Sequence, residues 1–187
     1  MKLYRADNPN RAKGQHFALE LVDAIAYKYN DGFGGNCIYE ADTKGLNIMN
    51  IEREEAHFLR DILGENWIDE YQTEAWALES PEVLSYMKEN GIDGIRFLDD
   101  FPNEASVLFI PKGMEMVIMN IDEKEGLLIG LKRYEYIFLA PAREYLAGRV
   151  WESEDNYLFE EDLEIETVIE LLENGKSNDG DFVLEIR

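Results

Sequence analysis

The chain has 187 residues, of which 45% are hydrophobic and 31% charged. It is therefore long enough to bury a core, and it is too apolar for an intrinsically disordered protein. Its 40 acidic residues face only 18 basic ones, which gives a formal net charge of -22. This charge disfavours direct binding to nucleic acid, because phosphates would be repelled. Such a surface serves solubility or attracts a basic partner.

The pattern of apolar residues and the single cysteine bear on the compartment. The longest apolar runs, at 116 to 119 and 137 to 140, are far shorter than the roughly 18 residues that a membrane-spanning helix needs. The first residues turn polar at once, unlike a signal peptide. With Cys37 as its only cysteine, the chain cannot form an internal disulfide. We expect a cytoplasmic protein with no membrane contact.

The N-terminal third predicts strands around one amphipathic helix. Lys2 to Ala6 reads as a first strand that ends in a polar turn, and Cys37 to Ala41 as a second. Between them, residues 19 to 29 place apolar side chains at helical spacing before Asn30 and glycines end the helix. Residues 47 to 51 predict a further short extended piece.

The middle of the chain predicts helices followed by a hairpin. Helical periodicity begins at Glu52 and ends at Gly64, and a second helix is expected over residues 67 to 78. A third begins at Ser80-Pro81, because serine is a good cap and proline suits the first turn. The strands 95 to 98 and 106 to 110 then flank an acidic turn.

Beyond residue 110 the pattern is less regular. A buried-looking strand is expected at 114 to 119, and the acidic composition increases from Trp151 to Glu166. The remaining predicted elements are short strands at 127 to 129 and 134 to 139, helices at 141 to 146 and 164 to 172, and a terminal strand at 182 to 186.

No residue pattern indicates a metal site or a phosphate-binding loop. The only histidines are His16 and His57, and no close pair of cysteine and histidine occurs. The glycines at 32, 34 and 35 follow no strand, and no lysine with serine or threonine comes after them. They indicate a turn.

Six short motifs follow one another in the first two thirds of the chain. They are Leu3-Tyr4-Arg5-Ala6, Gly14-Gln15-His16-Phe17-Ala18, Ala24-Ile25-Ala26-Tyr27, the strand 37 to 41, Gly91-Ile92-Asp93-Gly94-Ile95, and Glu104 before Ser106-Val107-Leu108-Phe109-Ile110-Pro111. In order and spacing this set resembles the NAD-dependent ADP-ribosyltransferase superfamily. No single motif is specific, and the resemblance covers roughly residues 1 to 120.

The resemblance implies an α+β fold with an ADP-ribosyltransferase-like split β-sheet and flanking helices. Residues 1 to 120 would form the NAD-binding domain, and residues 121 to 187 a small acidic α+β C-terminal extension. NAD would be the substrate. Small transferases of this superfamily carried by phages and mobile elements act on host machinery, so the resemblance also suggests an anti-defence effector.

The family's first two motifs imply a set of residues that contact NAD. Arg5 stands where the family has an arginine or histidine that contacts the ribose or phosphates, and its planar guanidinium suits such oxygens. His16, Phe17 and Ala18 stand in a run that has tyrosine at the His16 position in the poly(ADP-ribose) polymerase branch. Tyr27 matches a later tyrosine that stacks on nicotinamide.

The family's third motif implies a catalytic carboxylate in the acidic turn. Glu104 is the first candidate, because a carboxylate beneath the ribose stabilises the positive charge that grows as the nicotinamide bond breaks. Its distance to Pro111 is one residue longer than in many relatives. Asp99 and Asp100 lie in the same turn, so either of them is an alternative catalytic acid.

The predicted function is transfer of ADP-ribose from NAD to a macromolecule, with a protein as the expected target. A basic nucleic-acid-binding protein is one candidate, given the acidic composition. Two alternatives remain open. The chain is an acidic stoichiometric inhibitor that imitates nucleic acid on a catalytically inactive fold, or it hydrolyses NAD without an acceptor. The oligomeric state is not predicted.

Overall fold

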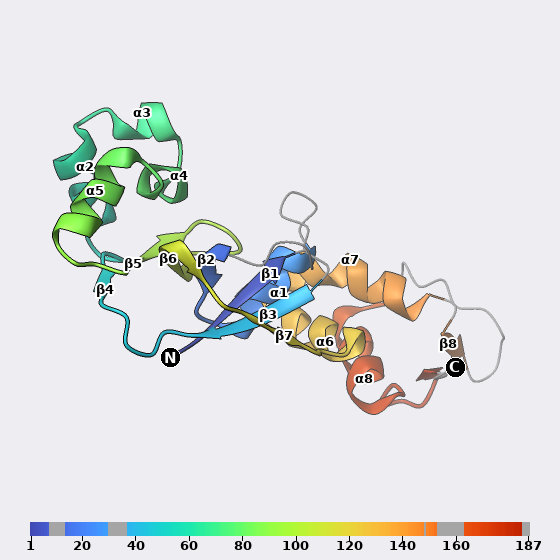
Figure 1. Cartoon of the computed structure of the whole chain (residues 1–187). Coiled ribbons are helices and arrows are strands. Elements are labelled where there is room, and N and C mark those ends of the chain that lie inside the picture. The colour runs from blue at the N-terminus through green and yellow to red at the C-terminus, as the bar shows by residue number, and fades with distance from the viewer. Residues whose placement is uncertain (8–13, 30–36, 148, 153–162, 185–187) are drawn as a thin grey trace. The chain divides into compact units, whose positions relative to one another are not determined.

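The computed structural model describes residues 1–7, 14–29, 37–147, 149–152 and 163–184, and they form an α+β protein (Figure 1). The chain divides into two compact units. The first unit comprises Met1–Lys28 and Phe33–Met119, and the second comprises Tyr29–Gly32 and Asn120–Arg187. The fold class predicted from the sequence is thus confirmed at the level of α+β.

A mixed sheet of seven strands organises the first unit. Its order is β4-β5-β6-β2-β1-β3-β7, with β4 parallel to β5 and the other neighbours antiparallel. Among the described residues, β1 and β2 are paired at one position, Tyr4 opposite Ala18, whereas β1 pairs with β3 over six residues. The strands are β1 (Lys2–Asp7), β2 (Gly14–Ala18), β3 (Cys37–Asp42), β4 (Ile48–Asn50), β5 (Gly94–Asp99), β6 (Ala105–Met114) and β7 (Val117–Met119).

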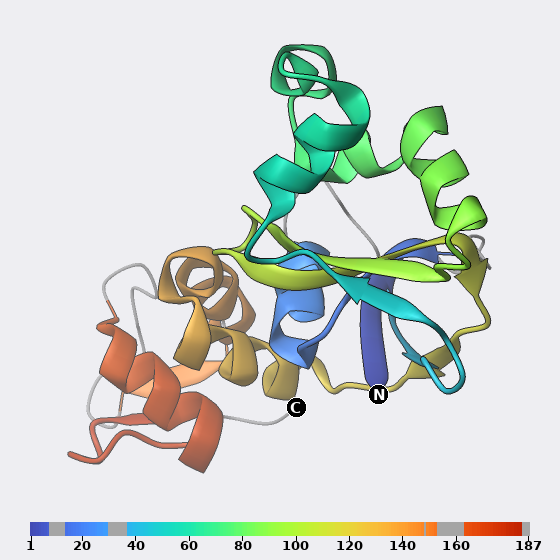
Figure 2. The same cartoon turned by 90° about the vertical axis from the view of Figure 1, so that its left-hand side faces the viewer.

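Helices α2 to α5 cover β5 and β6 on one face (Figure 2). Between them lies a core that includes Leu59, Leu78, Val83, Phe97 and Phe109, all almost fully buried. The helices of this unit are α1 (Leu21–Tyr29), α2 (Glu55–Leu63), α3 (Trp67–Tyr71), α4 (Glu74–Leu78) and α5 (Pro81–Glu89).

Strand β6 is buried on both faces, which explains its unbroken apolar run. Val107 and Phe109 face the helices, while Leu108 and Ile110 belong to a second core with Leu3 and other side chains of the opposite face. Neighbouring strand residues point to opposite faces, so a run of consecutive apolar residues indicates burial on both. β6 therefore anchors the unit.

Two helix boundaries show how capping decides the chain path. The Ser80 hydroxyl accepts a hydrogen bond from Val83 N at 3.3 Å, with Pro81 in the first turn, so the predicted start of α5 is confirmed. The single helix predicted over residues 67 to 78 is wrong. Gln72 has φ 68 and ends α3, and the Thr73 hydroxyl caps α4 by accepting from Trp76 N.

The second unit is mainly helical and corrects two strand predictions. Residues 127 to 129 lie in α6 (Glu123–Arg133), and residues 134 to 139 lie almost wholly in α7 (Glu135–Leu146). Asp122 caps α6, which has acids in its first turn and bases in its last, as the helix dipole favours. The short apolar runs alone did not separate strand from helix.

The rest of this unit comprises α8 and a small hairpin. α8 (Ile165–Asn174) ends at Gly175 in the left-handed conformation, close to the predicted end. β8 (Val150–Glu152) and β9 (Phe182–Leu184) pair antiparallel. Most of the predicted acidic run lies outside the described residues, as does the end of the predicted terminal strand.

Replacing Gly130 by alanine should destabilise the second unit. A Cβ at Gly130 would lie 2.3 Å from Cε1 of Phe138, whose side chain is fully buried. We expect the substitution to lower the free energy of unfolding by about 1–3 kcal/mol, although alanine is normally the better helix residue. Thermal and denaturant unfolding measure it. In a chain that also carries Phe138→Leu, Gly130→Ala should lower the free energy of unfolding by less. A Gly130→Ala variant as stable as wild type would contradict the close packing of Gly130 against Phe138.

Candidate functional site

A polar pocket of about 400 Å³ opens beside β1 and β2 of the first unit. β1 supplies Arg5, β2 supplies Gln15 and His16, and Glu79 follows directly after α4. Its remaining wall is the segment 111 to 113 of β6. The structure thus brings together Arg5 and His16, two residues that the sequence proposed as NAD contacts.

Arg5 is held in one orientation by two hydrogen bonds. Its Nε donates to Oδ2 of Asp7 at 2.8 Å, and its Nη1 donates to the main-chain oxygen of His16 at 2.7 Å. The contact with Asp7 follows from the strand, because residues two apart share a face. Asp7 is buried and the Arg5 side chain is 22% exposed. A guanidinium has five N–H donors, and the other three form no hydrogen bond with the described residues.

His16 is a neutral ring wedged among aromatic side chains. It stacks on Phe109 with centroids 4.9 Å apart and meets Phe97 edge-on at 6.0 Å. Burial first, and the charge of Arg5 second, lower its pKa to about 4. Nε2 is buried without a hydrogen-bond partner among the described residues. Nδ1 lies 3.6 Å from Oε1 of Glu79, too far for a hydrogen bond, so this contact is no ion pair at neutral pH.

The pocket carries both signs of charge. Arg5 and Lys112 are its cations, Glu79 is its acid, and Asp7 is ion-paired with Arg5. Lys112 is exposed and forms no ion pair with the described residues. Gln15 supports the wall, because its Nε2 donates to the main-chain oxygen of Pro111 at 3.1 Å. The guanidinium N–H groups of Arg5, and not a net positive charge, are what suit a phosphate-bearing ligand here.

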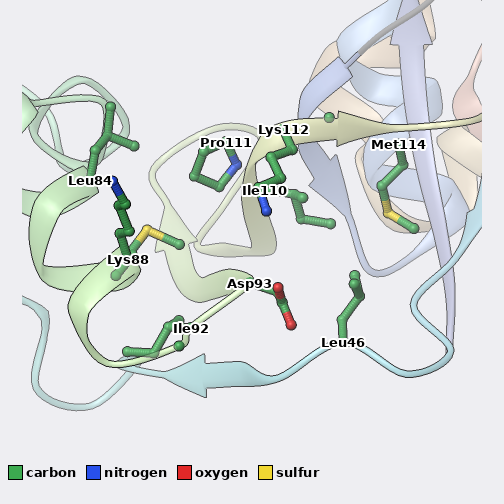
Figure 3. Close-up of a pocket in the computed structure, with 12 residues that line it drawn as sticks. Leu46, Leu84, Lys88, Ile92, Asp93, Ile110, Pro111, Lys112 and Met114 are labelled. Atoms are coloured by element: carbon green, nitrogen blue, oxygen red, sulfur yellow. The ribbon is translucent and has the colours of Figure 1, made fainter.

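A second, largely aliphatic pocket of about 480 Å³ shares the segment 111 to 113 with the polar one (Figure 3). Side chains from α5 and from both sides of β6 line it, with Asp93 near its floor in the view of Figure 3. Asp93 is already engaged, since its Oδ2 accepts from Asn47 N at 2.9 Å. The apolar lining residues include Leu46, Leu84, Met87, Ile92, Ile110 and Met114.

Tyr27 lies at the acidic turn. Its hydroxyl oxygen lies 2.7 Å from Asp99 Oδ2 and 2.7 Å from the Phe101 main-chain oxygen, and its single hydrogen can be donated to only one of them at a time. Its ring meets Phe101 edge-on at 5.1 Å. The structure therefore joins Tyr27 to the turn that holds the predicted catalytic acids, and Tyr27 does not line the polar pocket with His16.

The other proposed site residues lie apart from Arg5. Glu104 and Asp100 are exposed in the turn before β6, with Glu104 at φ 48, and neither contacts Arg5. Phe17 and Ala18 are buried, and Phe17 packs in the core with Leu3 and Leu108. The proposed residues are thus placed in the pocket, in the turn and in the core.

A charged cluster that sequence reasoning missed joins the start of α2 to the sheet. Oε1 of Glu52 accepts from Arg96 Nε at 2.7 Å and from the Ser106 hydroxyl, and Oε2 accepts from Asn50 Nδ2 at 3.2 Å. Burial alone would raise the Glu52 pKa, but these hydrogen bonds and the Arg96 charge outweigh it and lower the pKa. The signal in the sequence is an arginine within an apolar strand.

Glu55, in the first turn of α2, is a further acid close to Glu52 and to Asp100 of the acidic turn. Its Oε1 accepts from Leu98 N at 2.6 Å. Burial raises its pKa, and the charges of Glu74, Glu52 and Asp100 raise it further. The Glu55 carboxylate thus accepts a main-chain N–H of β5 although other acids lie near it. This hydrogen bond fixes the position of β5 next to the acidic turn.

Comparisons with protein-family models, with curated proteins and with solved structures find no match to this chain. Within the part of the chain that the structure describes, no group of three or more His, Cys, Asp or Glu side chains is placed to hold a metal ion. Among the same residues, every helix is too short or too polar to cross a membrane.

His16, whose side chain is 24% exposed, should make stability depend on pH. Its pKa is about 4 in the folded chain and about 6.5 when unfolded. The unfolded state therefore binds more protons between these values, so this contribution is complete above pH 6.5 and is lost as pH falls toward 4. Between pH 7 and 4.5, wild type should lose on the order of 2 kcal/mol more than His16→Phe.

Denaturant unfolding at both pH values measures this difference, and an NMR titration gives the ring pKa directly. The His57→Gln variant assigns the two histidine signals. A His16 pKa near 6.5 would contradict a partly buried, neutral ring. So would an equal loss in the free energy of unfolding for wild type and His16→Phe between the two pH values.

Removing the Tyr27 hydroxyl should destabilise the turn. Tyr27→Phe loses a hydrogen bond to a partly buried carboxylate, and we expect a cost of about 1–2 kcal/mol in the free energy of unfolding. Tyr86→Phe is the matched control, because the Tyr86 hydroxyl has no described hydrogen-bond partner and its ring meets Phe58 edge-on. Denaturant unfolding compares the two. Equal effects would show that the Tyr27 contact does not hold the turn.

Proposed function

We propose that the chain transfers ADP-ribose from NAD to a protein target. The observation that carries the proposal is the fixed guanidinium of Arg5 at the wall of a 400 Å³ pocket. Asp7 and the His16 carbonyl use two of its five N–H donors, and the other three, which have no partner among the described residues, would bind phosphate or ribose oxygens. A held guanidinium loses little entropy when it binds an anion.

The arrangement of the sheet also supports the proposal. β1 and β6 belong to the same seven-stranded sheet, both as neighbours of β2. Arg5 lies on β1, and Glu104 directly precedes β6. Asp99 is engaged by Tyr27, whereas Glu104 and Asp100 are exposed, which favours these two as the reacting acid.

In this proposal Arg5 binds the substrate and Glu104 serves the chemistry. The bond between C1′ of the ribose and the nicotinamide nitrogen breaks, and nicotinamide leaves with the bonding electrons. The Glu104 carboxylate stabilises the cation-like sugar. A nucleophile of the target then bonds to C1′, and its proton passes to Glu104. Arg5 and Glu104 do not contact each other, so the dinucleotide would have to join them.

The acidic composition points to a basic target. A net charge of -22 attracts basic surfaces and speeds their encounter at low salt. A basic nucleic-acid-binding protein of a host cell fits this charge, in keeping with the resemblance to phage and mobile-element effectors.

The test is transfer of label from labelled NAD to proteins of a bacterial lysate. Arg5→Lys keeps the charge but loses the planar fork, and we expect it to reduce labelling at least about tenfold. Arg53→Lys, at an exposed arginine before α2, is the matched control and should leave labelling unchanged. Glu104→Gln should reduce labelling about a hundredfold.

Other outcomes separate the alternatives. Equal labelling by wild type, Arg5→Lys and Glu104→Gln would contradict the proposed site. Release of nicotinamide without labelled protein would indicate NAD hydrolysis. Tight binding of a basic protein that needs no NAD and weakens steeply with salt, without any nicotinamide release, would indicate the inhibitor.

A further inference from the structure

The pair of helices α3 and α4 exposes two large apolar side chains. Trp76 is 58% exposed and Ile68 is 47% exposed. The opposite sides of these helices already supply the core, where Trp67 and Leu78 are buried. The core of this unit is thus filled without Trp76, and packing within the unit gives no reason for a tryptophan at this exposed position. Exposed tryptophan is typical of interaction surfaces.

The charged residues of the segment that carries these side chains all have one sign. Residues 65 to 79 contain no lysine or arginine. Glu65 is paired with Arg60 at 3.8 Å, but the next three acids along the chain form no ion pair with the described residues. The acids of this segment are Glu65, Asp69, Glu70, Glu74 and Glu79.

We propose that this α3–α4 surface docks an arginine-rich segment of a partner protein. The face of the Trp76 indole is available to a guanidinium, which stacks on it and gains cation–π attraction. Asp69, Glu70 and Glu74 then pair with neighbouring cations of the same segment. Lysine is the weaker partner, because ammonium lacks the planar face that stacks on indole.

The position of this surface connects it to the polar pocket. Glu79 directly follows α4 and lines the pocket, with its carboxylate 3.6 Å from Nδ1 of His16. Trp76 and Glu79 are three residues apart, so they lie on the same side of the helix. A segment docked on Trp76 therefore passes beside the pocket. Its identification as the acceptor of ADP-ribose rests on the proposed function, whereas the docking itself does not.

Binding of a nona-arginine peptide to the full chain tests the surface. Fluorescence anisotropy of the labelled peptide is measured without NAD, at about 0.1 M salt. Trp76→Ala should weaken binding about tenfold, and so should the double variant Glu70→Gln/Glu74→Gln. The matched control is Asp61→Asn/Glu89→Gln, which removes two exposed charges from α2 and α5 and should change binding less than about twofold.

Two results would overturn the inference. If the control weakens binding as much as the α3–α4 variant, or Trp76→Ala has no effect, the peptide is attracted only by the net charge. If nona-lysine binds as tightly as nona-arginine, the stacking on Trp76 is refuted. Because NAD is absent, failure of the labelling experiment and failure of this one are independent.

Discussion

The paired contacts of Arg5 are the constraint on which the proposed site depends. A guanidinium beside a pocket is an ion-binding group only if it is kept from folding back onto the surface. Here Asp7 and the His16 carbonyl hold it, and they come from β1 and β2, the two strands that share one described register pair. The same contacts tie these strands together, and the other three N–H donors have no hydrogen-bond partner among the described residues. One side chain thus links the strand pairing to the proposed ligand site.

His16 illustrates the cost of this arrangement. A buried ring nitrogen without a partner is unfavourable by roughly 1–3 kcal/mol, and Nε2 has none among the residues that the structure describes. Stacking on Phe109 and the edge contact with Phe97 offset this cost. Keeping the ring neutral also avoids a second positive charge next to Arg5. The ring at the pocket wall therefore stays neutral near pH 7.

The elements with strong local signals were predictable. The first strand, the helix after it and the Ser80 cap follow from alternation, periodicity and capping, and the structure confirms them. Residues 127 to 129 were mistaken for a strand because a short apolar run fits either structure. The break at Gln72 depended on the capping of α4 by Thr73, a signal present in the sequence but outweighed by the apolar periodicity around it.

The candidate site was only partly predictable, because its contacts join distant segments. Arg5 and His16 were expected together, and the structure places them in one pocket, but Glu79 reaches it only through the packing of α4. The Tyr27 hydroxyl hydrogen-bonds to the acidic turn, and stacking of its ring on nicotinamide stays a prediction. The most direct measurement is a crystal structure with NAD bound. We predict that an Arg5 N–H group bonds to a phosphate or ribose oxygen of NAD and that the Glu104 carboxylate lies beside C1′. NAD bound elsewhere, or bound without Arg5, would contradict the proposed site.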